Sequence, residues 1–235
     1  MKGKLHKGIF ITGTDTGVGK TFVAVGLMSV FKEMGFSVSP MKPLETGCRV
    51  KNGRLVPEDA LKLIEASNTK ESLEIINPYR FRFPLAPAVA AELEGRRIDK
   101  KKILSSYNYL SGKYDITLIE GAGGIMVPVY KKYLFLDIVE ELNIPLIIIS
   151  RPTLGTINHT LLTIEAARGR GIGVIGVIIN YASKIKRGLA EKTNPDVIEK
   201  LGGVPVLGVV PYSEANTPHL KKIFYKIAGR IYNSL

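Results

Sequence analysis

Short apolar runs alternate along the chain with longer segments in which apolar residues recur every three or four positions. The runs are rich in valine and isoleucine, which predicts strands buried on both faces. The longer segments have the period of amphipathic helices. We expect strands at residues 8–12, 37–41, 116–120, 145–150, 173–180 and 204–210. We expect helices at residues 20–34, 58–67, 87–94, 100–109, 136–142, 158–170, 195–201 and 218–234.

This alternation predicts an α/β fold with a mostly parallel sheet and helices on both faces. Internal repeats and linker-like stretches are absent from the sequence, so we expect residues 1–235 to form a single domain. Ligands of such sheets bind beyond the carboxyl ends of the strands. Polar segments follow several of the expected strands, and we therefore look for chemistry there.

The first of these segments runs from Gly13 to Thr21, between an expected strand and an expected helix. This is the setting of a phosphate-binding loop, whose N–H groups surround an anion at a helix N-terminus. Lys20 would reach the terminal phosphates, and the Thr21 hydroxyl would hold Mg²⁺. Thr14 stands where the strict pattern has glycine, and Gly13 comes one place earlier. The alternative is a glycine-rich turn with an incidental Lys-Thr pair, but the flanking elements favour a P-loop NTPase-like fold.

Three charged residues fall at expected element ends. Lys42 follows the second strand, where a cation could sit beside a transferring phosphoryl group or be an ordinary surface lysine. Glu120 ends the third strand and is followed by three glycines in four residues, which favours a partner of bound Mg²⁺. Asp59 opens a helix, and by itself it is typical of favourable charge at a helix start.

Two further segments leave both readings open. Residues 151–159 join a buried strand to a helix, which suits either a carboxylate site or a plain connection capped by Asn158. His159 is expected to pack on the helix rather than act as a base. Asn180 ends a buried strand, where its amide could read a purine edge or simply belong to a turn.

Composition places the chain among globular proteins, with 45% hydrophobic and 23% charged residues. The single Cys48 excludes an internal disulfide and suits a reducing compartment, so we expect a cytoplasmic protein. The net charge of +12 raises the possibility of nucleic-acid binding. The basic residues are scattered without interleaved aromatics, however, which favours a solvated surface that attracts anionic substrates.

Taken together, the segments resemble the dethiobiotin synthetase family, in the family's order and over most of the chain. The carrying stretches are residues 13–21, 42–43 with 46–47, 59–61, 77–79, 120–124, 154–159, Asn180, and 211–212. The resemblance implies an ATP- and Mg²⁺-dependent ligase of biotin biosynthesis with the substrates 7,8-diaminononanoate and CO₂. One amine would capture CO₂ as a carbamate, ATP would phosphorylate the carbamate, and the second amine would close the ring and release phosphate.

The same resemblance assigns roles to individual residues. It implies that Lys42, Lys20 and Thr16 surround the carbamate and γ-phosphate, and that Thr21, Asp59 and Glu120 bind Mg²⁺. For ATP it implies Gly17, Val18, Gly19, Lys20, Thr21, Phe22, Asp59, Glu120, Gly121, Ala122, Gly123, Asn180, Tyr181, Pro211, Tyr212 and Ser213. For the diamine it implies Thr46, Leu154, Gly155, Thr156 and Asn158, with residues 155–158 supplied by the other subunit of a homodimer. Gly17 replaces an acid found in some members.

Two rival functions remain for comparison. A cobyrinate amidating enzyme would need an additional glutamine-hydrolysing domain with a catalytic cysteine, for which this chain is too short. A partitioning or positioning ATPase would bind DNA or membrane, and residues 220–231 form a basic amphipathic segment that suits a membrane surface. Packing of that apolar face on the sheet is the favoured alternative. Such ATPases also carry a lysine where this chain has Asp15. We therefore expect neither nucleic acid nor membrane as a partner.

Overall fold

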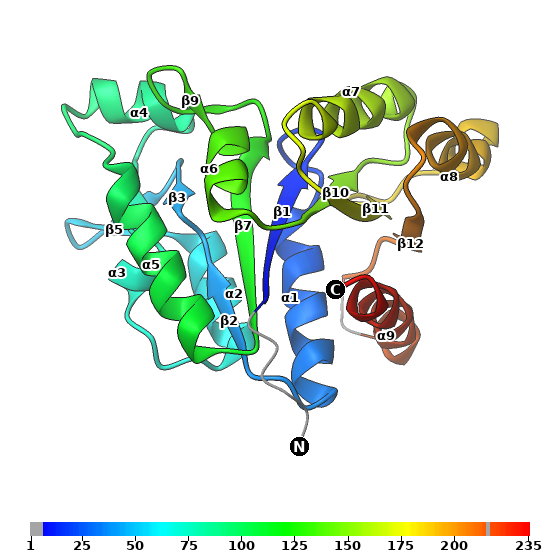
Figure 1. The fold of residues 1–235 in the computed structure, drawn as a ribbon, viewed down its shortest axis with the longest axis horizontal. Coiled ribbons are helices and arrows are strands. Elements are labelled where there is room, and N and C mark those ends of the chain that lie inside the picture. Colours follow the sequence, from blue (N-terminus) through cyan, green and yellow to red (C-terminus); the bar gives the residue numbers. More distant parts are fainter. Residues whose placement is uncertain (1–6, 215–216) are drawn as a thin grey trace.

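The computed structural model of the protein describes residues 7–214 and 217–235. Its centre is a parallel six-stranded sheet with the strand order β12-β11-β10-β1-β7-β2 (Figure 1). The strands are β1 (Lys7–Gly13), β2 (Val38–Met41), β7 (Ile116–Gly124), β10 (Leu146–Ser150), β11 (Val174–Asn180) and β12 (Val206–Val210). All six strands expected from the sequence are thus confirmed, with ends that shift by a few residues.

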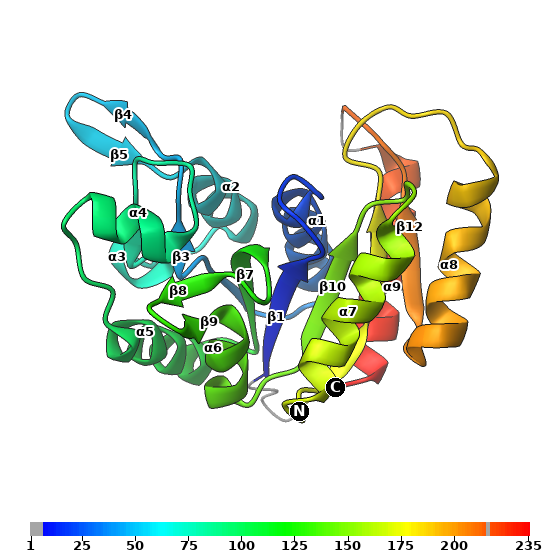
Figure 2. The same cartoon turned by 90° about the horizontal axis from the view of Figure 1, so that it is seen from above.

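Helices cover both faces of this sheet, as Figure 2 shows from above. On one face lie α1 (Lys20–Glu33), α2 (Glu58–Ser67) and α9 (Pro218–Asn233). On the other lie α4 (Pro87–Leu93), α5 (Lys100–Lys113), α6 (Phe135–Leu142), α7 (Thr156–Arg168) and α8 (Leu189–Gly202). The α/β architecture expected from the alternating pattern is therefore confirmed.

The two faces use alternate residues of the same strands. Ile9 and Ile11 of β1 pack in the core under α1, while Phe10 between them packs in the core under α5 and α6. All three side chains are fully buried. Successive strand side chains point to opposite faces, so a continuous apolar run is what a sheet covered on both sides requires.

Two helix starts differ from the expectation by two residues or more. Helix α7 begins at Thr156 rather than at residue 158, because Gly155 takes the left-handed conformation and serves as its N-cap. Helix α8 begins at Leu189 rather than at Pro195, because the N–H of Gly188 bonds to the Glu191 carboxylate and starts the helix earlier. Pro195 then lies inside the helix, where it lacks one N–H donor.

Several short elements were not expected from the pattern. They are α3 (Leu73–Ile76), the parallel pair β3 (Leu44–Glu45) and β6 (Tyr79–Arg80), the hairpin of β4 (Arg49–Lys51) and β5 (Arg54–Val56), and the hairpin of β8 (Pro128–Tyr130) and β9 (Tyr133–Leu134). Segments of two to four residues are too short to show a period. Those labelled in Figure 2 lie in the half of the molecule that contains α2, α4 and α5, and the β4–β5 hairpin projects from it.

The C-terminal helix α9 buries its apolar face, as favoured above. Leu220, Phe224, Ile227 and Ile231 are at most 3% exposed and belong to the core under α1. The apolar face of residues 220–231 is thus occupied by the sheet. In the part of the chain that the structure describes, no helix is both long and apolar enough to cross a membrane.

Candidate active site

The phosphate loop connects β1 to α1 and depends on two glycines with positive φ. Gly17 has φ 74° and Gly19 has φ 88°, a region that residues with a Cβ rarely adopt. A Cβ on Gly19 would lie 2.2 Å from Nδ2 of Asn180, whereas one on Gly17 would meet no atom within 4 Å. Gly19 is the N-cap of α1, so the first N–H groups of this helix are available to an anion.

The Lys20 side chain folds back toward the phosphate loop. Its Nζ is 3.4 Å from the carbonyl oxygen of Asp15, and the residue is only 7% exposed. Burial, and then the positive charge of nearby Lys42, lower the pKa of the Lys20 ammonium to about 8. Two cations therefore converge at the loop, which favours the binding of a multiply charged anion such as a triphosphate.

Lys42, at the end of β2, lies at the centre of a buried ion-pair network. Its Nζ is 2.6 Å from Oε1 of Glu120 and 3.4 Å from Oδ2 of Asp59. The same Oε1 accepts a 2.8 Å hydrogen bond from the Thr21 hydroxyl. Burial by itself lowers the pKa of Lys42, but the carboxylates of Glu120 and Asp59 outweigh it and hold that pKa above its ordinary value. Four residues from α1, β2, α2 and β7 are thereby brought together.

The oxygen atoms of this network fit a hard divalent cation. Oε2 of Glu120 is buried and has no hydrogen-bond partner among the described residues, so it is available as a ligand. Hydroxyl and carboxylate oxygens are what Mg²⁺ prefers, and it commonly takes its remaining ligands from water and substrate phosphates. Within residues 7–214 and 217–235, there is no group of three or more His, Cys, Asp or Glu side chains that could hold a metal ion.

The backbone of Lys42 is fixed by a buried residue that the pattern did not single out. Asn77 is fully buried, and its Nδ2 donates to the Lys42 carbonyl at 2.6 Å. The Lys42 N–H donates to the carbonyl of Ile76 at 2.8 Å. A second such contact joins Arg151 to Asp15 of the phosphate loop at 2.6 Å. Asn77, Arg151 and Asp15 all lie in segments noted in the sequence, but the partners are far apart along the chain, so no local pattern indicated that they contact one another.

A cavity of about 800 Å³ opens in front of the network. Its polar lining includes residues of the loop, Thr46 and Glu45. Its apolar lining includes residues 84–87 and Val127. The lining residues are Thr16, Gly17, Gly19, Lys20, Thr21, Lys42, Glu45, Thr46, Asp59, Pro84, Leu85, Ala86, Pro87, Glu120, Ala122, Gly123, Val127 and Ala182. Such a cavity suits a ligand with a charged end and an aliphatic portion.

A second cavity of about 510 Å³ lies at the ends of β11 and β12. Its lining residues are Tyr181, Lys184, Ile185, Arg187, Pro211, Tyr212, Ser213 and Glu214. Asn180, next to it in sequence, donates from Nδ2 to the Val18 carbonyl at 2.9 Å. Oδ1 of Asn180 is buried and unpaired within the described part of the chain. The Asn180 side-chain amide is therefore anchored to the phosphate loop through Nδ2, and Oδ1 remains available to a ligand.

Residues 154–158 lie apart from these cavities and line neither of them. Leu154 is 82% exposed and Asn158 is also exposed, whereas Thr156 is fully buried. Phe22 packs against Phe224 of α9, with the ring centroids 6.2 Å apart. The structure thus brings most of the expected nucleotide residues together but leaves the segment at the start of α7 on the surface.

Comparison with known proteins gives a family and a fold. A family model described as an AAA domain matches residues 7–219. An ATP-dependent dethiobiotin synthetase of Thermodesulfovibrio yellowstonii is 44% identical over 215 residues, covering 88% of this chain and 90% of the relative. The enzymes of the same name from Methanocaldococcus jannaschii and Bacillus subtilis strain 168 are 41% and 42% identical. They cover 88% and 87% of this chain, and 94% and 87% of their own lengths.

Solved structures are similar in fold at much lower identity. The MinD cell division protein of Aquifex aeolicus has a TM-score of 0.60 at 16% identity and covers 97% of both chains. The pNOB8 ParA protein bound to nonspecific DNA has a TM-score of 0.61 at 16% identity, with 97% of this chain and 98% of that chain covered. At this identity the likeness concerns the arrangement of helices and strands, and it confirms the P-loop ATPase-like fold.

Proposed function

The chain belongs to the AAA domain family and, within it, to the ATP-dependent dethiobiotin synthetases, and from that premise we propose that it joins 7,8-diaminononanoate to CO₂ at the expense of ATP. The observation that carries the proposal is the buried Lys42–Glu120 pair beside Thr21 of the phosphate loop. It borders a cavity lined by charged residues and by the apolar residues 84–87 and Val127.

The nucleotide end of the site is supported by the loop and by Asn180. The free N–H groups at the start of α1 and the Lys20 ammonium would hold the β- and γ-phosphates. Thr21, Asp59 and Glu120 would hold Mg²⁺, which supplies positive charge beside the transferring phosphoryl group. Oδ1 of Asn180 is an unused acceptor, which suits the exocyclic amino group of adenine.

The substrate end follows from the apolar part of the cavity lining. The aliphatic chain of the diamine would lie along residues 84–87 and Val127, because apolar contact there removes it from water. One amine then attacks CO₂ and loses a proton to give a carbamate, whose negative oxygen would lie beside the Lys42 ammonium. That oxygen attacks the γ-phosphorus and releases ADP. The second amine attacks the carbamoyl carbon and loses a proton to water, which closes the ring and expels phosphate.

Lys42 is well placed to favour the phosphoryl transfer. Charge develops on the carbamate oxygen and the phosphoryl oxygens as the bond forms, and a fixed cation stabilises it without reorganising. The buried carboxylate of Glu120 keeps Lys42 protonated, since it holds the pKa of that ammonium above its ordinary value. A protein nucleophile is not required by this sequence of steps.

We further propose that residues 154–158 complete the site of a second copy of the chain. The exposed start of α7, with Leu154 82% exposed, is consistent with covering by another subunit. Its N–H groups would hold the substrate carboxylate. We expect Asn158→Ala to raise the KM for the diamine with nucleotide affinity unchanged. Mixed dimers of Asn158→Ala and Lys20→Ala subunits should regain one active site, and mixed dimers that stay inactive would refute the shared site.

The activity is tested with purified protein, ATP, Mg²⁺, bicarbonate and the diamine, by measuring phosphate release and product mass together. We expect one phosphate and one dethiobiotin for each ATP consumed, with no turnover when the diamine is omitted. ATP hydrolysis that proceeds unchanged without the diamine would count against a ligase and favour a switch-type ATPase.

A further inference from the structure

Helix α2 begins with a cap supplied from a distant strand. Its own N-cap residue is Pro57, whose side chain cannot accept a hydrogen bond. The carboxylate of Glu45, in β3, takes that place. Its Oε1 accepts the N–H of Asp59 and its Oε2 accepts the N–H of Ala60, both at 2.9 Å. These are among the first N–H groups of the helix, which the helix itself cannot satisfy.

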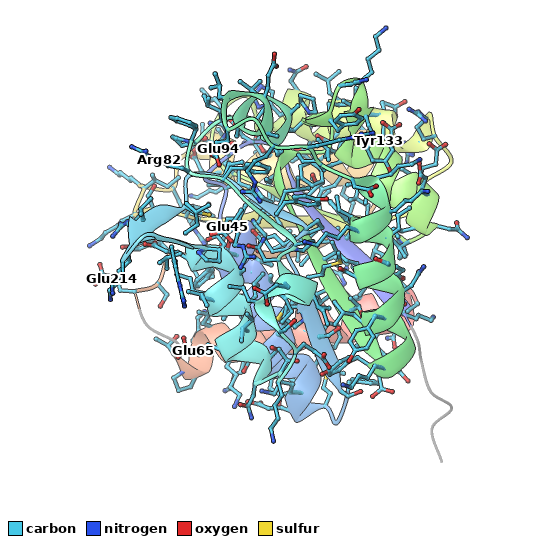
Figure 3. All side chains as sticks on the ribbon, turned by 90° about the vertical axis from the view of Figure 1, so that its left-hand side faces the viewer. Glu45, Glu65, Arg82, Glu94, Tyr133 and Glu214 are labelled. Carbon is cyan, nitrogen blue, oxygen red and sulfur yellow. The ribbon has the colours of Figure 1, made fainter. Side chains whose placement is uncertain are left out.

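This carboxylate is buried although it borders the main cavity. Glu45 is 6% exposed and is one of the lining residues. Figure 3 shows Glu45 within the body of the molecule, in contrast to Glu214 at its edge. A buried charge needs compensation, and here the two N–H groups and the positive end of the α2 dipole provide it.

The main chain of Glu45 is itself held firmly. Strand β3 pairs with β6, so that Glu45 stands opposite Arg80. The Glu45 carbonyl accepts the N–H of Phe81 at 2.8 Å. The same strand starts two residues after Lys42, whose own backbone is fixed by Asn77. The carboxylate is therefore presented to α2 from a segment that is continuous with the ion-pair network.

One of the two N–H groups that Glu45 holds belongs to Asp59. Fixing this amide fixes the point from which the Asp59 side chain leaves the helix. That side chain reaches within 3.4 Å of Lys42 Nζ, although it is 40% exposed and has water on one side. Without the Glu45 contact, the first turn of α2 would be free to fray, and fraying begins with the residues nearest the end.

We propose that Glu45 is a positioning residue that sets Asp59 in place to bind the divalent cation of the nucleotide site. The inference rests on the proposed function, in which Asp59 is a Mg²⁺ ligand. Glu45 acts through the backbone of Asp59, because its two carboxylate oxygens accept the N–H groups of Asp59 and Ala60.

Four variants distinguish a positioning role of Glu45 from an effect of its charge and from a general loss of protein stability. Glu45→Ala removes both contacts, while Glu45→Gln removes the same charge but keeps one acceptor for an N–H. Glu58→Gln removes a charge from the same helical turn, where Glu58 pairs at the surface with Arg49. Asp99→Ala removes the cap of α5, where Asp99 accepts the N–H of Lys101. The last two variants are the matched controls.

Two measurements are made on each full-length variant. Hydrogen exchange reports the protection of the Asp59 and Ala60 amides, and Mn²⁺ paramagnetic resonance reports cation affinity in the presence of a non-hydrolysable ATP analogue. We expect Glu45→Ala to weaken Mn²⁺ binding by about 10-fold or more, the usual effect of losing a residue that orients a ligand. Glu45→Gln should fall between Glu45→Ala and the wild type in both measurements, and the two controls should bind Mn²⁺ normally.

The outcomes distinguish the two proposals. Equal losses in Glu45→Gln and Glu45→Ala would assign the effect to charge alone and overturn positioning. Wild-type Mn²⁺ affinity in Glu45→Ala would also overturn the positioning role, provided that Asp59→Asn binds Mn²⁺ more weakly than the wild type. If Asp59→Asn itself binds Mn²⁺ normally, the metal assignment in the proposed function is wrong and the inference falls with it. Should Glu45→Ala fail to fold, Glu45→Gln against Glu58→Gln still decides the question.

Discussion

Replacement of Lys42 by glutamine tests the centre of the site most directly. The Lys42 side chain is 3% exposed and that of Glu120 is 1% exposed, with 2.6 Å between Nζ and Oε1. Glutamine has a similar reach but carries no charge. The variant therefore leaves the Glu120 carboxylate buried without its cation, while the Thr21 hydroxyl still donates to it.

The cost in stability follows from this burial. Removing one partner of a buried ion pair costs about 3–5 kcal/mol, because the remaining charge stays desolvated. We expect the lower end, about 3 kcal/mol, since the hydrogen bond from Thr21 to the charged oxygen remains. In a chain of this length, that free energy lowers the melting temperature by roughly 6–12 °C.

Differential scanning calorimetry without nucleotide measures this shift in melting temperature. The double variant Lys42→Gln/Glu120→Gln, together with the two single variants, completes a double-mutant cycle. We expect the double variant to recover a large part of the loss, because no buried charge is left unpaired. In the activity assay, we expect kcat of Lys42→Gln to fall by about 10²–10³ while ATP affinity changes little. A single variant that melts with the wild type, or that retains a near-normal kcat, would refute the reasoning.

Three further predictions follow from the same geometry. Lys20→Ala and Thr21→Ala should both lose turnover, but only the Thr21→Ala defect should ease at high Mg²⁺; identical Mg²⁺ responses in initial-rate assays would contradict the separate roles. Gly17→Ala should cost about 1 kcal/mol, for backbone strain alone, whereas Gly19→Ala adds a clash with Asn180 and should cost clearly more in urea unfolding; equal losses would rule the clash out. Burial raises the pKa of the Cys48 thiol from 9.0 to about 11. In folded protein at pH 8, Cys48 should therefore react with iodoacetamide about 100-fold more slowly than an ordinary thiol; rapid labelling would mean that the thiol is not buried.

The sequence by itself determined the layered architecture. The six central strands and the helices between them follow from local patterns, because the spacing of apolar residues within a short segment distinguishes a strand from a helix. The phosphate loop is equally local, because a strand, a glycine turn and a helix start follow one another directly from Gly13 to Thr21. The order of the polar strand ends then placed Lys42 and Glu120 at one edge of the sheet, and the structure has them in contact.

Only the tertiary structure decided which side chains complete one another across long stretches of chain. The Glu45 carboxylate caps a helix that starts 13 residues later, and Arg151 reaches Asp15 over 136 residues. Strands β3 and β6 are two residues long, which is too short for a pattern of apolar residues to predict them. Their pairing nevertheless fixes the backbone position of Glu45. The amide of Asn180 is oriented by Val18 from another strand–helix junction. Such contacts depend on how whole elements pack against one another. The spacing of residues within one segment does not specify which distant segment it will contact.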